Sequence, residues 1–220
     1  MIKAVIFDFD GLILDTETAW YNAYKKVLQD EYQFELKLDD FVKCVGADDQ
    51  VLFELLEERL GDRLVRSKIK EKAVEIHTKS VEELSMREGV LDYLKSAKEL
   101  GLKIAICTSS TRAWIEKHLT NLNLYFYFDY FVTQDDVEKI KPDPELFQKT
   151  IEVLDVQPNE AIVFEDSLNG LISAQRANIP VVLVPNPVTE HLPFIDYFLR
   201  VDSMERMSLQ AILEQAKLTL

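Results

Sequence analysis

The sequence predicts an α/β fold in which a doubly wound, mostly parallel sheet carries an all-helical segment inserted after its first strand. Three observations support this prediction. Short apolar runs recur along the chain and are continuous rather than alternating, which is typical of parallel strands covered on both faces. Helical patterns lie between most of these runs, as the crossovers of a parallel sheet require. One long stretch near the N-terminus has helical periodicity and no strand pattern.

Five short apolar runs are the predicted strands. They are Lys3–Phe7, Leu102–Thr108, Tyr130–Thr133, Ala161–Glu165 and Val181–Val184. Their length and their lack of alternation indicate strands that are buried on both faces. We therefore expect them to form the centre of the fold, with helices on both sides.

Four helices are predicted between and around these strands. They are Gly89–Leu100, Arg112–Leu122, Pro144–Leu154 and Asp166–Ala177. The first of them is followed directly by Gly101, a residue that commonly ends helices. Each predicted helix follows or precedes a predicted strand, which is the alternation of a doubly wound fold.

Residues 16–87 interrupt this alternation. They contain AWYNAYKKVLQ, QVLFELLEERL and KIKEKAVEIHTKSVEEL, which have helical periodicity, and no convincing strand. We therefore predict an α/β core formed by residues 1–15 and 88–220 and a helical cap formed by residues 16–87. Two chain crossings would join the parts, as in a cap that opens and closes. A single compact domain with an elaborate crossover remains the alternative.

Composition narrows the class of protein. With 220 residues and 47% apolar residues, the chain is long enough for a core domain with a smaller insert. The net charge of −14 disfavours nucleic acid and anionic membranes as partners. No apolar run has the length of a membrane span, and the N-terminus lacks the pattern of a secretory signal, so we expect a cytoplasmic protein. Cys44 and Cys107 have no metal-type or disulfide spacing.

Polar residues follow four of the predicted strands. They are Asp8 and Asp10 after the first strand, Thr108, Ser109 and Ser110 after the second, Lys141 after the third, and Glu165 and Asp166 at the fourth. Ligands of open α/β sheets bind beyond the carboxyl ends of the strands. We therefore expect these residues to form one site. Since this site is complete within one chain, we also expect that a monomer can function.

The acidic residues at this edge indicate a metal site. Clustered carboxylates are costly to bury without compensation, and oxygen ligands suit a hard divalent cation such as Mg²⁺. Asp8, Glu165 and Asp166 can each supply a carboxylate oxygen. Glu165 and Asp166 alone could also cap the following helix. The combination with Asp8 favours the metal.

The remaining residues suit phosphoryl transfer. Thr108 offers a hydroxyl, Ser109 offers a backbone N–H near a helix start, and Lys141 offers a point charge, all suited to phosphate oxygens. Asp8 could attack phosphorus and form an aspartyl-phosphate. Asp10 could protonate the leaving oxygen and later accept a proton from the second nucleophile.

These motifs resemble the haloacid dehalogenase superfamily of aspartyl phosphotransferases. More narrowly, the chain is similar to the β-phosphoglucomutase-like and phosphoglycolate phosphatase-like phosphatases with a helical cap. The resemblance is carried by DFDGLILDTE (8–17), TSS (108–110), KPDPELF (141–147) and EDSLNG (165–170), and it extends over essentially the whole chain.

The resemblance implies a Rossmann-like core and a role for each matched residue. It implies that Mg²⁺ is held by Asp8, the backbone carbonyl of Asp10, Glu165 and Asp166. It implies that Asp8 is the nucleophile and Asp10 the acid and base. Thr108 and Lys141 would hold the transferred phosphoryl group.

Within this family, the sequence favours a phosphatase that acts on a small phosphorylated metabolite. Dehalogenating members generally lack the second aspartate, here Asp10. Sugar-phosphate mutases typically carry His, Lys and Arg at positions where this chain has Trp20, Val45 and Asp49. The chain is therefore poorly equipped to hold a second phosphate, and water is the simpler final acceptor.

Several alternatives stay open at this point. A mutase of the β-phosphoglucomutase type is the main one, and a non-catalytic phospho-ligand-binding protein is more remote because no expected functional residue is lost. Receiver-type signalling modules are about half as long. Hexose phosphates, phosphoglycolate, glycerol phosphates and nucleoside monophosphates all remain candidate substrates. Trp20 could pack between helices or contact substrate, Arg112 could face substrate or solvent, and the loop around Gly46 has no assigned role.

Overall fold

The computed structural model describes residues 1–45 and 49–219. The described residues form a six-stranded sheet in the order β3-β2-β1-β4-β5-β6, and every neighbouring pair is parallel. The strands are β1 (Ala4–Phe7), β2 (Lys103–Cys107), β3 (Tyr130–Val132), β4 (Ala161–Glu165), β5 (Val181–Leu183) and β6 (Leu199–Arg200). The prediction of a doubly wound parallel sheet is confirmed.

Strand β1 lies at the centre of the sheet. Val5 is paired with Ile104 of β2 on one side and with Ile162 of β4 on the other. The strand order reverses at this point, so the sheet has its ligand-binding crevice at the carboxyl end of β1. All four residues of β1 are completely buried, in agreement with the continuous apolar pattern.

Helices cover both faces of the sheet. Val5 and Phe7 point into a cluster that includes apolar residues of α5 (Val90–Glu99), α6 (Arg112–Asn121) and α9 (Leu209–Thr219). Ala4 and Ile6 point into a second cluster with α7 (Glu145–Leu154) and α8 (Leu168–Arg176). This two-sided burial follows from the alternation of side chains along a strand.

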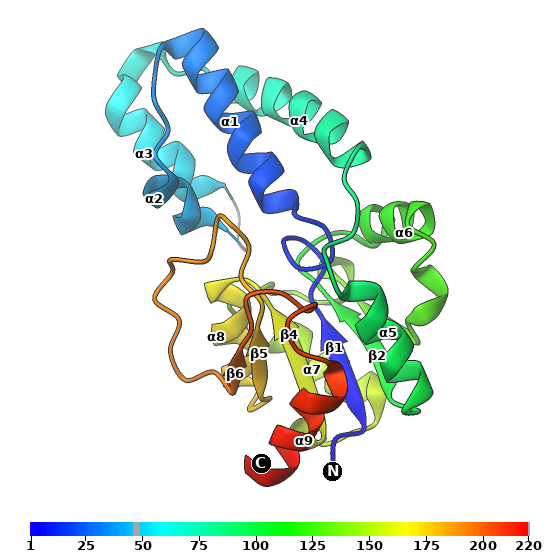
Figure 1. Cartoon of the computed structure of the whole chain (residues 1–220). Helices are drawn as coiled ribbons and strands as arrows, with labels where there is room; N and C mark the ends of the chain where they lie inside the picture. Colours follow the sequence, from blue (N-terminus) through cyan, green and yellow to red (C-terminus); the bar gives the residue numbers. More distant parts are fainter. Residues whose placement is uncertain (46–48, 220) are drawn as a thin grey trace.

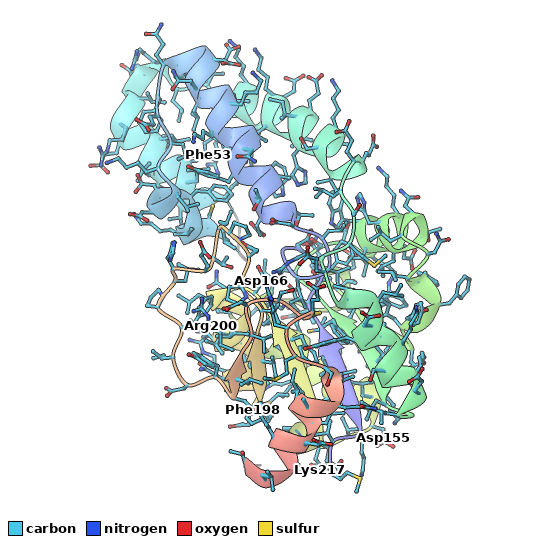
Figure 2. The ribbon with its side chains drawn as sticks, in the orientation of Figure 1. Phe53, Asp155, Asp166, Phe198, Arg200 and Lys217 are labelled. Atoms are coloured by element: carbon cyan, nitrogen blue, oxygen red, sulfur yellow. The ribbon has the colours of Figure 1, made fainter. Side chains whose placement is uncertain are left out.

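The segment between β1 and α5 contains helices joined by loops and has no strand among its described residues. It contains α1 (Thr16–Tyr32), α2 (Leu38–Phe41), α3 (Gln50–Leu60) and α4 (Arg66–Glu82), and we refer to α1–α4 as the helical segment. Its apolar residues form a third cluster, around Leu28, Phe53 and Leu56. Figure 1 shows these helices grouped beyond the end of β1, and Figure 2 shows Phe53 among them.

The helical segment begins with a clear local signal. The side chain of Asp15 accepts a hydrogen bond from the N–H of Thr18 and thereby caps α1. Short 3₁₀ turns complete the connections of the fold. They are Val42–Cys44, Gly61–Arg63, Tyr125–Tyr127, Gln134–Asp136 and Pro158–Glu160.

The C-terminal part of the fold was not predicted. Strand β6 has two residues, of which Arg200 is exposed, so it has no apolar run that would indicate a strand. The loop before β6 also reaches the helical segment, because Val188 belongs to the apolar cluster of that segment. Among the described residues, no helix combines the length and the apolar character needed to cross a bilayer.

Candidate active site

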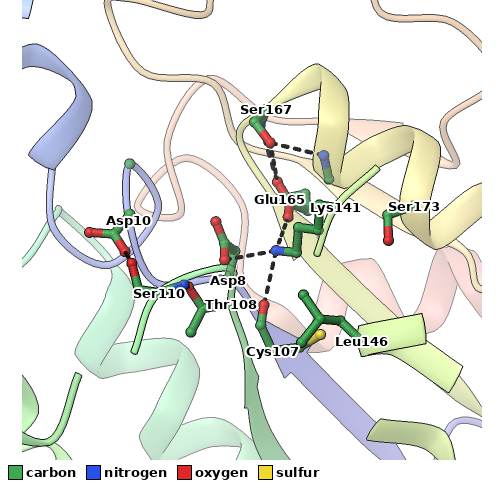
Figure 3. A network of polar contacts seen from close by, with 12 residues as sticks. Asp8, Asp10, Cys107, Thr108, Ser110, Lys141, Leu146, Glu165, Ser167 and Ser173 are labelled. Atoms are coloured by element: carbon green, nitrogen blue, oxygen red, sulfur yellow. Dashed lines mark hydrogen bonds and ion pairs between the residues drawn. The ribbon is translucent and has the colours of Figure 1, made fainter. Parts of the chain in front are cut away.

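Asp8 and Lys141 form the centre of the candidate site. Asp8 follows β1, and its Oδ1 lies 2.8 Å from Nζ of Lys141. The same ammonium group lies 2.5 Å from Oε1 of Glu165 and donates to the carbonyl of Cys107 at 2.9 Å (Figure 3). Lys141 is 2% exposed and Glu165 is completely buried. The ends of three strands thus meet around one buried cation.

Burial and like charges shift the protonation of this cluster. Burial raises the pKa of Asp8 to about 7, with Lys141 lowering it and Glu165 raising it further. Burial, together with the charges of Glu165 and Asp8, holds the pKa of Asp166 well above its usual value. Burial disfavours the charged form of Lys141, but the carboxylates of Asp8 and Glu165 outweigh this effect and raise its pKa. The acids outnumber the cation, so another positive charge would stabilise the site.

The geometry of the acids fits a hard divalent cation. Asp8, Glu165 and Asp166 each offer a carboxylate oxygen, and these oxygens lie within 4.8 Å of one another. Oδ2 of Asp166 accepts a hydrogen bond from Asn186 at 2.7 Å, whereas its buried Oδ1 has no partner within the described part of the chain. An unpaired, buried carboxylate oxygen is costly unless a cation binds it. The donor set consists of oxygens, as Mg²⁺ requires.

The loop after Glu165 fixes this carboxylate. Oε2 of Glu165 accepts hydrogen bonds from the backbone N–H groups of Asp166 and Ser167 and from the Ser167 hydroxyl. The hydroxyl of Ser167 also accepts from the N–H of Gly170 and caps α8. The EDSLNG motif therefore orients Glu165 through its own backbone and the Ser167 hydroxyl, whereas Asp166 is held by Asn186.

Asp10 has a different set of partners. Its Oδ1 accepts hydrogen bonds from the hydroxyl of Thr16 at 2.9 Å and from Nε1 of Trp114 at 3.0 Å. Its Oδ2 accepts from the hydroxyl of Ser110 at 2.6 Å, and Figure 3 shows the carboxylate directed at Ser110 rather than at Asp8. The side chain of Asp10 therefore lies outside the cluster formed by Asp8, Glu165 and Asp166. The predicted metal ligand at Asp10 is its backbone carbonyl, which takes no part in these side-chain hydrogen bonds.

The loop after β2 places Thr108 and Ser109 beside Asp8. Both residues line the cavity described below. Thr108 is buried, and its hydroxyl accepts a hydrogen bond from the N–H of Ser110 at 3.2 Å. The hydroxyl of Ser109 is buried and has no partner in the described structure. Helix α6 begins only after its N-cap Thr111, so the N–H of Ser109 belongs to the loop and not to the helix start.

A cavity of about 570 Å³ lies between the sheet edge and the helical segment. The sheet side contributes Asp8, Asp10, Thr108, Ser109 and Lys141, and the helical segment contributes Glu17, Trp20, Tyr24, Asp49 and His77. Glu165 and Asp166 are completely buried and do not line it. Figure 2 shows Asp166 near the boundary between the sheet and the helical segment. The predicted residues are thus brought together at one end of a cavity.

Of the three residues between β1 and α5 that the sequence singles out, Trp20 and Asp49 line this cavity and Val45 does not. Trp20 lines it and stacks on His77 with ring centroids 3.6 Å apart, so it packs between helices and also faces the cavity. Asp49 lies 2.9 Å from Nζ of Lys70 and accepts a hydrogen bond from the hydroxyl of Tyr24. The carbonyl of Val45 accepts a hydrogen bond from Asn169 at 2.8 Å. The neighbouring Gly46 lies outside the described residues.

Arg112 forms hydrogen bonds with residues of and after β3. Its guanidinium donates to the carbonyl of Phe131 at 2.9 Å and to Asp136 at 3.2 Å, and its backbone N–H donates to Asp135. It is absent from the cavity wall. Of the two possibilities that the sequence left open, substrate or solvent, the structure favours the second: the side chain is 37% exposed while it makes these hydrogen bonds.

Several residues of the site had no assigned role in the sequence. Burial, followed by the charges of Asp10 and Asp8, raises the pKa of Glu17 to about 8. Arg87 donates to the carbonyls of Gly11 at 2.5 Å and Pro185 at 2.7 Å, and so ties together two loops at the sheet edge. Glu17 is part of a motif that was noted in the sequence. Arg87 lies in an ordinary polar stretch and gave no signal.

Comparison with known proteins identifies the family of the chain. The family model of haloacid dehalogenase-like hydrolases matches residues 5–184. YhcW of Bacillus subtilis (strain 168), whose name describes a candidate phosphatase, is 43% identical over 215 residues, which is 97% of each chain. The phosphorylated carbohydrates phosphatase of Thermotoga maritima is 31% identical over 182 residues, covering 81% of this chain and 82% of the relative.

Solved structures show the same fold. CbbY from Rhodobacter sphaeroides, solved in complex with phosphate, superposes with a TM-score of 0.75 at 25% identity. The match covers 93% of this chain and 96% of CbbY. Because the family model spans most of the chain and YhcW is similar along nearly its whole length, the chain is an enzyme of the haloacid dehalogenase-like hydrolase family.

Proposed function

We propose that this protein is a Mg²⁺-dependent phosphatase that hydrolyses a small phosphorylated metabolite through an aspartyl-phosphate at Asp8. One observation carries the proposal: Asp8 lines the cavity, pairs with a buried ammonium group and belongs to a cluster of acids that suits a divalent cation. The names of the relatives support the reaction class, since one is a phosphorylated carbohydrates phosphatase. The site draws all of its residues from one chain, which supports a functional monomer.

In the first step, a carboxylate oxygen of Asp8 attacks phosphorus, and the bond between phosphorus and the leaving oxygen breaks. Asp10 donates its proton to this oxygen, so that the leaving group departs as an alcohol. In the second step, ionised Asp10 accepts a proton from water, and the water oxygen attacks phosphorus. The bond to Asp8 breaks, and inorganic phosphate is released. Oδ2 of Asp10 must exchange its hydrogen bond with Ser110 to reach the reacting oxygen, while Trp114 can keep its hydrogen bond to Oδ1.

The surrounding residues would stabilise the transferred group. Asp8, Glu165, Asp166 and the backbone carbonyl of Asp10 would hold Mg²⁺, which when bound neutralises negative charge on the phosphoryl oxygens. The ammonium group of Lys141 is already beside Asp8 and can balance charge on both the nucleophile and the phosphoryl group. Thr108 and Ser109 can donate hydrogen bonds to phosphoryl oxygens.

We also propose that residues 16–87 act as a cap over a core formed by residues 1–15 and 88–220. Contacts join the two parts next to the cavity: Asn169 donates to the carbonyl of Val45, and His77 stacks near Trp114 with ring centroids 5.7 Å apart. A closed cap would exclude bulk water from the aspartyl-phosphate.

A mutase remains the second candidate function. Release of inorganic phosphate distinguishes a phosphatase from a mutase. We would measure phosphate release from a panel of phosphorylated metabolites with Mg²⁺ and with EDTA. In parallel, β-glucose 1-phosphate with trace bisphosphate would be tested for formation of glucose 6-phosphate. The proposal expects metal-dependent phosphate release without isomerisation. Isomerisation without release would establish a mutase, and neither activity across the panel would contradict the proposed reaction.

A further inference from the structure

One wall of the cavity is aromatic and is built from three helices. Trp20 of α1 stacks on His77 of α4 with centroids 3.6 Å apart and an angle of 11° between the rings. His77 in turn stacks on Trp114 of α6 at 5.7 Å. All three residues line the cavity. A ligand that enters this end of the cavity therefore meets a broad apolar surface with one polar ring in its middle.

The ring of His77 has an unused nitrogen. His77 is 2% exposed, and its Nε2 has no hydrogen-bond partner in the described residues 1–45 and 49–219. The ring does have a hydrogen bond with the backbone of Thr16. If the nitrogen facing the Thr16 carbonyl carries the proton, Nε2 has a lone pair and can only accept. A buried acceptor without a donor is costly, and because His77 lines the cavity, a ligand bound there can supply the donor.

The neutral ring is the stable form in this environment. Burial, together with the nearby charge of His118, lowers the pKa of His77 to about 4. At neutral pH, Nε2 would therefore repel an anionic oxygen and attract the hydrogen of a hydroxyl group. The aromatic faces on either side of the ring suit the C–H surface of such a group.

The charges around the cavity point to the same kind of ligand. Lys141, at the reacting end, is the one cation among the described residues that line the cavity. Residues 46–48 are Gly, Ala and Asp, so they add no cation. Lys70 and Arg66 lie close by but pair with Asp49, at 2.9 and 3.7 Å. A second anionic group on the substrate would find no cation among the described residues that line this wall.

We propose that His77 determines specificity for the leaving group, because its Nε2 accepts a hydrogen bond from a hydroxyl of an uncharged group that packs against Trp20 and Trp114. This inference rests on the proposed phosphatase function and specifies which substrates the enzyme selects. Substrates would be monophosphates of hydroxylated molecules, and bisphosphates would be selected against. Hydroxyls beside an apolar face occur in sugars, in alditols and in the ribose of nucleosides.

The test measures kcat/KM of the full-length protein with Mg²⁺ for four monophosphates and one bisphosphate. They are a hexose 6-phosphate, an alditol phosphate, a nucleoside 5′-monophosphate, propyl phosphate and a hexose 1,6-bisphosphate. At least one hydroxylated monophosphate should exceed both propyl phosphate and the bisphosphate by about 10-fold or more, the effect of one well-placed hydrogen bond. The hydroxylated monophosphate with the highest kcat/KM then shows whether the hydroxyl belongs to a hexose, an alditol or a nucleoside.

Variants then test the residue itself. His77→Phe should lower the ratio of kcat/KM for the preferred substrate over propyl phosphate by about 10-fold, mainly through KM. His77→Gln, which can place an acceptor near the same point, should restore part of it. His118→Phe is the matched control: His118 is also buried with an unpaired Nε2 but does not line the cavity, so the ratio should stay the same.

A measurement on the unaltered enzyme tests the same inference even if a variant fails to fold. Among monodeoxy analogues of the preferred substrate, one should lose about 10-fold in kcat/KM while the others do not. Equal rates for all analogues, preference for the bisphosphate, or an unchanged ratio in folded His77→Phe would overturn the inference while the phosphatase stands. Absence of phosphate release from every compound would instead contradict the proposed function.

Discussion

Trp114 connects the helical segment to the residue that the proposed mechanism uses as acid and base. Its Nε1 donates to Asp10 at 3.0 Å, and its ring stacks on His77. A hydrogen bond that holds Asp10 in a defined orientation contributes to proton transfer only when the leaving group needs a proton. The importance of Trp114 should therefore depend on the substrate.

Trp114→Phe keeps an aromatic ring but removes the hydrogen bond to Asp10. We expect kcat to fall by about 10-fold for an alkyl phosphate, whose leaving oxygen is strongly basic. p-Nitrophenyl phosphate has a good leaving group and should be affected much less in its first step. Steady-state kinetics with both substrates measure this difference. Equal losses for the two substrates would show that Trp114 acts only through packing.

Sequence reasoning predicted the candidate site residues that follow strands and missed Trp114 and His77, which come from helices. Asp8, Thr108 and Lys141 were predictable because parallel strands end at one edge of the sheet. Trp114 and His77 lie within ordinary amphipathic helices. Their contacts depend on how the helical segment packs against the core: Trp114 meets Asp10 across 104 positions of the sequence. Periodicity within one helix contains no information about such a contact.

Helix α8 approaches the cluster of Asp8, Glu165 and Asp166 closely because it has a glycine, Gly170, at the contact. A Cβ atom at this position would collide with the carboxylate of Glu165. The first turn of α8 also provides the hydrogen bonds of Ser167 that orient this carboxylate. The position of the helix and the geometry of the acid are therefore linked.

We expect Gly170→Ala to weaken Mg²⁺ binding by about 10–100-fold, since residues that orient a metal ligand typically have effects of this size. The substitution forces either Glu165 or the helix to move. Isothermal titration calorimetry with Mg²⁺ measures the effect on affinity, and circular dichroism checks that the helices persist. Unaltered affinity in a folded variant would mean that Glu165 is not a ligand.

The regular elements were predictable to different degrees. Strands β1 and β4 are completely buried and give continuous apolar runs, so β4 was predicted with its observed bounds and β1 with one extra residue, Lys3. Strand β6 owes its conformation to pairing with β5, where Leu199 lies beside Val182. It is too short to have a pattern of its own. Helix α9 packs against the same face as α5 but follows a long irregular connection, and it was not predicted.

At the scale of the whole molecule, the buried acids make stability depend on pH and on metal. In the metal-free protein, the pKa of Asp8 rises from 3.8 to about 7 and that of Glu17 from 4.5 to about 8. The folded state therefore holds protons that the unfolded chain has already released between about pH 4 and pH 8. Their contribution to stability is complete below about pH 4 and is lost as pH rises through this window.

Mg²⁺ should reverse part of this loss, because metal binding requires ionised carboxylates and competes with protons. We expect the free energy of unfolding in EDTA to be lower at pH 8 than at pH 5.5. The increase on adding Mg²⁺ should be larger at pH 8. Urea unfolding at both pH values, with and without Mg²⁺, tests this. An increase that is independent of pH would show that protons and metal do not share a site.

The measurement that tests the central claim most directly is phosphate release by Asp8→Asn beside the unaltered protein, with the same substrate and saturating Mg²⁺. The amide is nearly isosteric with the carboxylate but is a far weaker nucleophile, so the fold should persist and turnover should be abolished. Circular dichroism and thermal unfolding would establish that the variant is folded. Turnover at an unimpaired rate in the folded variant would contradict the aspartyl-phosphate mechanism.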